Sequence, residues 1–163
     1  MSDMSGLRIS TDRRELDIDM IHAFLTNEAP WSKGISRETV ARSIEGSLCF
    51  GAYLGAQQVG FARVVTDYAT FGYLCDVFVH RSYRGRGYAR ALMRAVFDSE
   101  VLASLRRIVL VTTDAHEIYR PLGFNNLANP ERYMELHRVD VYATAPGRNH
   151  SNQDNHDSHD AIV

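Results

Sequence analysis

The chain has 163 residues, 45% of them apolar, which suits one globular domain with a hydrophobic core. Its formal net charge is −2, whereas proteins that coat nucleic acid carry a clear basic excess, so that class is disfavoured. The sequence has no stretch typical of a membrane span, and the first ten residues lack the apolar run of a signal peptide. We therefore expect a cytoplasmic protein with no membrane partner.

The first half of the chain predicts a strand, two helices and a β-hairpin. Residues 7–9 form a candidate edge strand. Apolar residues at helical spacing begin after Asp17, a suitable N-cap, and a second short helix follows Ser36. Two apolar runs at 48–54 and 59–65 then read as the hairpin.

The second half predicts alternating strands and helices. Residues 71–79 are apolar except for Asp76, as expected of a strand covered on both faces. A helix at 87–98, a strand at 108–111, a short helix at 115–120 and a last strand at 133–139 follow. The predicted class is therefore α/β (mixed α+β), in one domain over residues 1–143.

The last twenty residues, 144–163, are rich in Asn, His, Asp and Ser, which predicts a disordered polar tail. We expect His150, His156 and His159 to be solvated and no metal site to form there, because nothing fixes the geometry of these side chains. Cys49 and Cys75 lie in apolar surroundings and are expected to be buried thiols, not a disulfide or a zinc site.

The most informative segment is Arg84-Gly85-Arg86-Gly87-Tyr88-Ala89, which follows a strand and opens a helix. A helix N-terminus presents unpaired N–H groups, and glycines let an anion approach the backbone. This segment predicts a pyrophosphate site to which Arg84 and Arg86 add charge. It lacks the third glycine of a dinucleotide fingerprint and the Gly-Lys-Ser/Thr of a P-loop. A solvated glycine turn and a small RNA-binding patch remain as alternatives.

A second motif makes the first more specific. Arg84-x-x-Gly87-x-Ala89 matches the R/Q-x-x-G-x-G/A pattern of GNAT acetyltransferases, and Ala115-x-x-x-Tyr119-x-x-x-Gly123-Phe124 resembles the C-terminal signature of that family. The resemblance covers about residues 7–140. It implies a central, mostly antiparallel mixed sheet flanked by helices, with a V-shaped splay between the central strands. It departs from the family pattern at Pro121 and at His80-Arg81.

The same resemblance implies that acetyl-CoA is the co-substrate. Its pyrophosphate would lie on Arg84 to Ala89, and its pantetheine arm would contact the backbone of Val77, Phe78 and Val79. Tyr119 would contact the cofactor and act as general acid, because the leaving thiolate needs a proton.

The attacking amine must also lose a proton, and Asp76 is the candidate base. A carboxylate in an apolar strand is costly unless it has a role, although a structural, backbone-capping aspartate is the equal alternative. The strand also resembles that of spermidine/spermine acetyltransferases, but Cys75 replaces their glutamate, which makes a polyamine acceptor doubtful. Trp31, Asp67, Tyr68 and Phe71 are candidate acceptor contacts, because aromatic and acidic groups favour a cationic amine.

The predicted function is acetyl transfer from acetyl-CoA to a primary amine of a small molecule by direct attack in a ternary complex. A protein or peptide acceptor and a non-catalytic acyl-CoA sensor are the alternatives. The family also suggests a homodimer.

Overall fold

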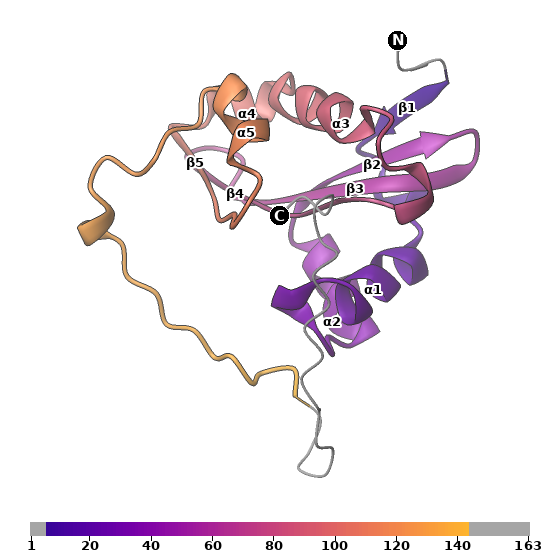
Figure 1. Ribbon diagram of the computed structural model, residues 1–163, viewed down its shortest axis with the longest axis horizontal. Helices are drawn as coiled ribbons and strands as arrows, with labels where there is room; N and C mark the ends of the chain where they lie inside the picture. The colour runs from indigo at the N-terminus through magenta and orange to yellow at the C-terminus, as the bar shows by residue number, and fades with distance from the viewer. Residues whose placement is uncertain (1–5, 144–163) are drawn as a thin grey trace.

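The computed structural model describes residues 6–143, and the tail predicted for 144–163 lies outside them. One sheet crosses the molecule with its strands in chain order, β1-β2-β3-β4-β5 (Figure 1). The first four strands are antiparallel and β5 runs parallel to β4. Their bounds are β1 Leu7–Ser10, β2 Leu48–Leu54, β3 Gln57–Thr66, β4 Phe71–Val79 and β5 Arg107–Leu110.

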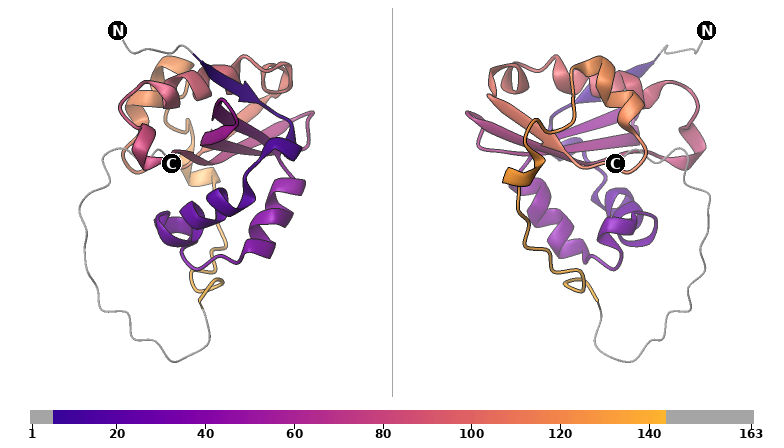
Figure 2. Two further views of the ribbon diagram at one scale, coloured as in Figure 1. Left: turned by 90° about the vertical axis from the view of Figure 1, so that its right-hand side faces the viewer. Right: turned by 60° about the vertical axis from the view of Figure 1, so that its left-hand side comes forward.

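Helices cover both faces of the sheet, so the fold has three layers (Figure 2). One face carries α1 (Ile18–Asn27) and α2 (Arg37–Glu45), and the other carries α3 (Tyr88–Phe97), α4 (Glu100–Ser104) and α5 (His116–Tyr119). The predicted N-caps are confirmed: the side chain of Asp17 accepts from the N–H of Met20, and that of Ser36 from the N–H of Thr39.

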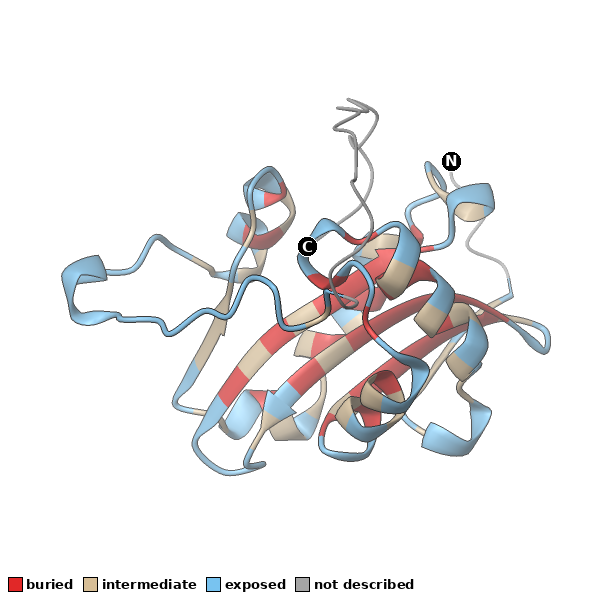
Figure 3. Cartoon of the chain, turned by 90° about the horizontal axis from the view of Figure 1, so that it is seen from below, coloured by how far each residue is buried: buried red, intermediate tan, exposed pale blue. Residues whose placement is uncertain are grey.

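The core is accordingly split in two by the sheet. The cluster on the α3 side contains Val77, Val79 and Leu92, and the cluster on the α1 side contains Phe24 and Phe78, whose rings stack at 3.8 Å. Figure 3 shows the buried residues concentrated along the central strands. The strand predicted at 71–79 is thus covered on both faces, as its apolar sequence indicated.

A β-bulge interrupts β4 at Asp76. Phe61 pairs with Phe78 and Arg63 with Cys75, so β4 carries one extra residue between these pairs. Asp76 has a φ of 53°, which is rare for a residue other than glycine. Leu74 and Val77, three residues apart, consequently face the same core cluster. The bulge turns Asp76 toward the α1 layer.

The predicted splay begins at this bulge. β4 and β5 pair only over Phe71–Leu74 and Arg107–Leu110. From Cys75 to Val79, β4 keeps its pairing with β3, but in the described chain no strand lies on its other side. The two parallel strands therefore diverge toward their C-terminal ends.

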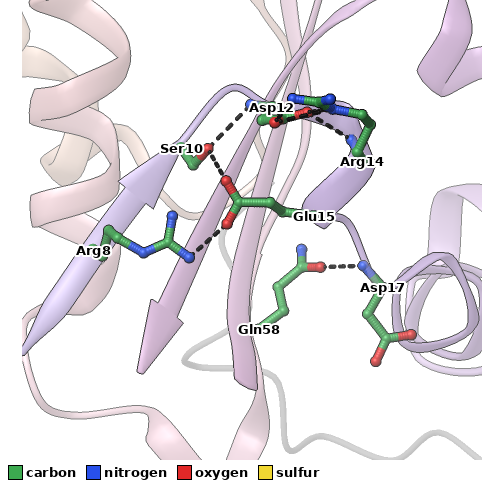
Figure 4. Close-up of polar contacts among 7 residues, drawn as sticks. All are labelled: Arg8, Ser10, Asp12, Arg14, Glu15, Asp17 and Gln58. Carbon is green, nitrogen blue, oxygen red and sulfur yellow. Dashed lines mark hydrogen bonds and ion pairs between the residues drawn. The ribbon is translucent and has the colours of Figure 1, made fainter. Parts of the chain in front are cut away.

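A cluster of polar contacts holds the segment that connects β1 to α1 (Figure 4). Glu15 accepts from Arg8 at 2.6 Å and from Ser10 at 2.9 Å, and the backbone N–H of Asp17 donates to the buried Gln58 at 2.7 Å. The Gln58 contact sets where α1 begins relative to β3.

The strand predicted at residues 133–139 is wrong. The segment after Phe124 contains one 3₁₀ turn, Pro130–Arg132, and otherwise no regular structure up to residue 143. Alternating residues make a strand only when a neighbouring strand takes their backbone hydrogen bonds, and no described strand lies beside this segment. The short helix α4, which was not predicted, connects α3 to β5.

Candidate active site

The glycine segment forms an open anion cradle at the start of α3. Gly85 and Gly87 have φ values of 75° and 81°, a conformation that other residues adopt only with strain. No side chain caps the N-terminus of α3, and nothing lies within 4 Å of the position of a Cβ at Gly85. The first N–H groups of the helix are thus presented without an obstructing side chain.

The two arginines of the cradle have different surroundings. Arg84 is largely buried, donates from Nε to the carbonyl of Val79 at 2.9 Å, and lies 3.9 Å from the carboxylate of Glu28. Arg86 is exposed; its guanidinium lies 5.4 Å from the ring centre of Tyr83 and 3.4 Å from the carbonyl of Ser82. Arg84 therefore holds the end of β4, and Arg86 is the exposed cation at the cradle.

Tyr88 and Ala89, the last two residues of the motif, begin α3 and pack on the core. Tyr88 is only 5% exposed. Their side chains secure the helix, so any contribution they make to anion binding comes from the backbone.

Beyond the bulge, successive backbone N–H groups of β4 point alternately toward β3 and toward the opposite side. His80 donates its N–H to the carbonyl of Val59 on β3, and the carbonyl of Phe78 lies beside Gly60 of the same strand. Because alternate residues face opposite sides, the N–H groups of Val77 and Val79 point to the side left open by the splay. Of the three predicted backbone contacts, Val77 and Val79 are therefore oriented toward the opening, whereas Phe78 faces β3.

Tyr119 lies on α5, beside the last part of β5. It is 2% exposed, its ring meets Phe124 edge-on with 5.8 Å between centres, and burial raises the pKa of its hydroxyl above the ordinary value. It also lines a cavity of about 290 Å³ that runs along β5 to Leu127. A phenol with a raised pKa keeps its proton at neutral pH, as a general acid must.

Asp76 is held by two partners, and neither bond was predicted. Its Oδ2 accepts from Nε of Arg63 at 2.9 Å, and its Oδ1 accepts from Nε1 of Trp31 at 2.9 Å. Arg63 donates in turn to the hydroxyl of Ser47 at 3.0 Å. The side chains of Arg63 and Asp76 are 17% and 8% exposed, so this ion pair is nearly buried. The sequence carried a signal for Arg63, the one charged residue in the apolar run 59–65.

The four residues predicted to contact the acceptor lie in two different places in the structure. Trp31 lies in the short 3₁₀ turn Pro30–Ser32 and is 36% exposed, with its indole N–H on Asp76. Asp67 instead closes its own turn. Its carboxylate accepts from the hydroxyl of Thr70 and from the backbone N–H groups of Ala69, Thr70 and Phe71. These bonds, of which the one from the Thr70 hydroxyl has the largest effect, hold the pKa of Asp67 well below the ordinary value.

Tyr68 and Phe71 accompany Asp67 at the far end of β4. Both are exposed, and Phe71 pairs with Arg107 where β4 and β5 are still joined. Only Trp31 of the four candidates is therefore brought to Asp76.

The two cysteines are free thiols packed near this network. Burial raises the pKa of Cys49 to about 11 and that of Cys75 to about 12. Among residues 6–143, no group of three or more His, Cys, Asp or Glu side chains is arranged to hold a metal. No helix in that range has the length and apolarity needed to cross a membrane.

Known proteins match both the sequence and the fold. The pattern of the Acetyltransferase (GNAT) family matches residues 16–124. A crystal structure from Xanthomonas campestris pv. campestris, described as belonging to the GNAT family, is 46% identical, covers 85% of this chain and 97% of its own, and has a TM-score of 0.82.

More distant relatives agree with it. A Gibberella zeae protein described as an acetyltransferase, FG08082, is 29% identical over 131 residues, and the match covers 68% of this chain and 74% of the relative. A structure from Deinococcus radiodurans R1 is 21% identical with a TM-score of 0.66 over 88% of this chain and 96% of its own, and it supports the fold. The chain belongs to the GNAT family and is an acyltransferase of the acetyltransferase type.

Proposed function

We propose that this enzyme transfers the acetyl group of acetyl-CoA to a primary amine of a small molecule, by direct attack within a ternary complex. The observation that carries the proposal is the run of chain from Asp76 through the end of β4 at Val79 to the cradle. Along it, the outward-facing backbone groups of Val77 and Val79 join a buried carboxylate to an anion site.

The residues present fit acetyl-CoA. Gly85, Gly87 and the exposed Arg86 suit its pyrophosphate, because they combine open N–H groups with a positive charge. The N–H groups of Val77 and Val79 suit the amides of an extended pantetheine chain, which they would bind as a sheet edge binds an added strand. When bound, acetyl-CoA supplies an activated acetyl thioester.

Tyr119 is the proposed proton donor. Its hydroxyl retains its proton at neutral pH because burial raises its pKa, and it can give that proton to the leaving sulfur. Asp76 is the proposed proton acceptor for the amine. Each carboxylate oxygen retains a further lone pair beside the bonds from Trp31 and Arg63, so the carboxylate can still receive a hydrogen bond from the acceptor.

A small acceptor is favoured by the position of Trp31. The indole donates to Asp76, which holds the turn Pro30–Ser32 beside the carboxylate, and we expect this turn to narrow the approach of an acceptor. The exposed part of the ring offers a face for a cationic amine. A peptide backbone would need an open groove at this position.

The test is release of free thiol from acetyl-CoA in the presence of polyamines, amino acids, aminoglycosides, arylalkylamines and short peptides. We expect release with one class of small amine, and a fall in kcat of about 10²-fold or more in Tyr119→Phe. Release with peptides alone would exclude the small-molecule acceptor.

Tyr53→Phe is the matched control. Tyr53 is also buried, and its hydroxyl has no hydrogen-bond partner among the described residues, so its removal leaves no group unpaired. Its kcat should equal that of the unmodified enzyme. If Tyr119→Phe behaves like Tyr53→Phe, Tyr119 is not the general acid.

A further inference from the structure

Arg63 is the one charged residue of β3, and it lies between the two cysteines in the sheet. It pairs with Cys49 of β2 on one side and with Cys75 of β4 on the other. Residues directly opposite one another share a face of a sheet, so Arg63 lies on the α1 side, where Cys49 belongs to the core cluster. A guanidinium in such surroundings loses hydration, so its donors need other partners.

Two of the three guanidinium nitrogens of Arg63 have protein partners. Nε donates to Oδ2 of Asp76 at 2.9 Å, and Nη1 donates to the hydroxyl of Ser47 at 3.0 Å. Nη2 donates to no acceptor within residues 6–143. Among the side chains of that range that are not exposed, the hydroxyl of Tyr53 is the only buried nitrogen or oxygen without a partner. Nη2 of Arg63 is therefore not buried, and its N–H groups are free to bind a ligand.

Nη2 lies on the same edge of the guanidinium as the Nε–H that holds Asp76. The guanidinium is planar and its donors form a rigid fork, so one N–H of Nη2 runs parallel to Nε–H. In a bidentate pair the second carboxylate oxygen would accept that N–H, but Oδ1 of Asp76 accepts instead from the indole of Trp31 at 2.9 Å. A free donor thus lies directly beside the proposed proton acceptor.

The site carries one charge of each sign. The side chains of Asp76 and Arg63 are 8% and 17% exposed, and their charges cancel. An amine that binds to Asp76 as a lone cation also lies near the guanidinium, which repels it. A molecule that carries an ammonium group next to a carboxylate meets both protein charges favourably. The second cation of a polyamine finds no anionic partner in this pair.

We propose that Nη2 of Arg63 binds the carboxylate of the acceptor, and that the acceptor is a free α-amino acid. One carbon separates the amino group from the carboxylate in such a molecule, which matches the direct contact between the two protein charges. The ammonium group faces Asp76 and the exposed part of the Trp31 ring, and the carboxylate accepts the free N–H. This inference rests on the proposed acetyl transfer and adds the class of its acceptor.

The reaction balances with these groups. Transfer to the ammonium form of the amino acid yields the N-acetylamino acid, the free thiol of the coenzyme and one proton. The bond from nitrogen to the acetyl carbon replaces the bond from that carbon to sulfur. Of the two protons that nitrogen loses, one passes through Asp76 to solvent, and the other replaces the proton that Tyr119 gives to sulfur.

Matched acceptors test the carboxylate contact. Each α-amino acid that releases thiol from acetyl-CoA is compared with its own amide and with the amine that lacks the carboxyl group. We expect kcat/KM to be about 10²-fold lower for both analogues, because each loses a charge-assisted hydrogen bond to Arg63. Equal or faster release with any other amine would overturn this inference and leave the proposed acetyl transfer standing. Release with no amine at all would refute both.

A substitution of Arg63 assigns the preference to this residue. In Arg63→Gln the ratio of kcat/KM between an amino acid and its amide should fall by about tenfold or more, whereas Arg63→Lys keeps the charge and should keep most of the preference. A ratio measured on one preparation does not depend on how much of the protein is folded. The matched control Arg37→Gln also removes an arginine from an ion pair, the exposed one with Asp19, and should leave the ratio unchanged. An unchanged ratio in Arg63→Gln would show that Arg63 only holds Asp76, and would overturn the carboxylate site.

Discussion

Asp76 combines features that seldom occur together in one residue: a positive φ, near-complete burial and two hydrogen bonds to its carboxylate from different elements. An ion pair that is nearly buried loses hydration, so such a pair is retained more often for a specific arrangement than for stability. The arrangement here places a carboxylate beside the open edge of β4. Both the catalytic and the structural interpretation of Asp76 agree with this position, and a substitution separates them.

We expect Asp76→Asn to lower kcat by about 10²-fold or more, because an amide accepts the Trp31 hydrogen bond but cannot take a proton from an amine. The measurement is thiol release with saturating amine, with thermal unfolding recorded on the same samples. Tyr68→Phe serves as the control, since Tyr68 lies at the far end of β4. Full turnover in Asp76→Asn with a lowered melting temperature would make Asp76 a structural residue.

At the scale of the element, the junction of β4 and α3 depends on backbone conformation. Gly85 and Gly55 form a matched pair for testing it, because both have positive φ, 75° and 58°, and open space at the Cβ position. An alanine at either position carries a strain of roughly 1–2 kcal/mol. We expect Gly85→Ala and Gly55→Ala to lose similar stability, whereas only Gly85→Ala weakens acetyl-CoA binding, by about tenfold. Calorimetric titration measures the affinity, and equal affinities in both variants would mean that the cradle does not bind the phosphates.

The elements differ in how far the sequence predicts them. Those with a local cause were predicted: Asp17 and Ser36 cap their own helices, and Pro121 lies in the 3₁₀ turn Arg120–Leu122 that ends α5. The Arg63–Asp76–Trp31 network was not, because its bonds join residues 13 and 45 positions apart in the sequence. The strand predicted at 133–139 was wrong. The alternation of apolar and polar residues is a local feature of the sequence, whereas a strand also needs a neighbouring strand from another part of the chain, and no described strand lies beside this segment.

For the whole molecule, the buried titratable groups set the behaviour of the fold at high pH. Burial raises the pKa of Cys49 from 9.0 to about 11, and those of Cys75 and Tyr53 to about 12. Above pH 9 the unfolded chain therefore loses protons that the folded chain retains. The unfolded state then binds fewer protons, so the free energy of unfolding falls as pH rises, from about pH 9 through the folded-state pKa values.

We expect the urea midpoint to be constant between pH 7 and 8.5 and to fall from pH 9 to 11. Cys49 alone accounts for roughly 2–3 kcal/mol of that loss, since each pKa unit corresponds to about 1.4 kcal/mol. Cys49→Ala should therefore have a shallower slope over this range, whatever its midpoint at pH 7, because it removes the titrating thiol. Identical slopes for Cys49→Ala and the unmodified protein would show that the thiol is as accessible to proton loss in the folded state as in the unfolded one.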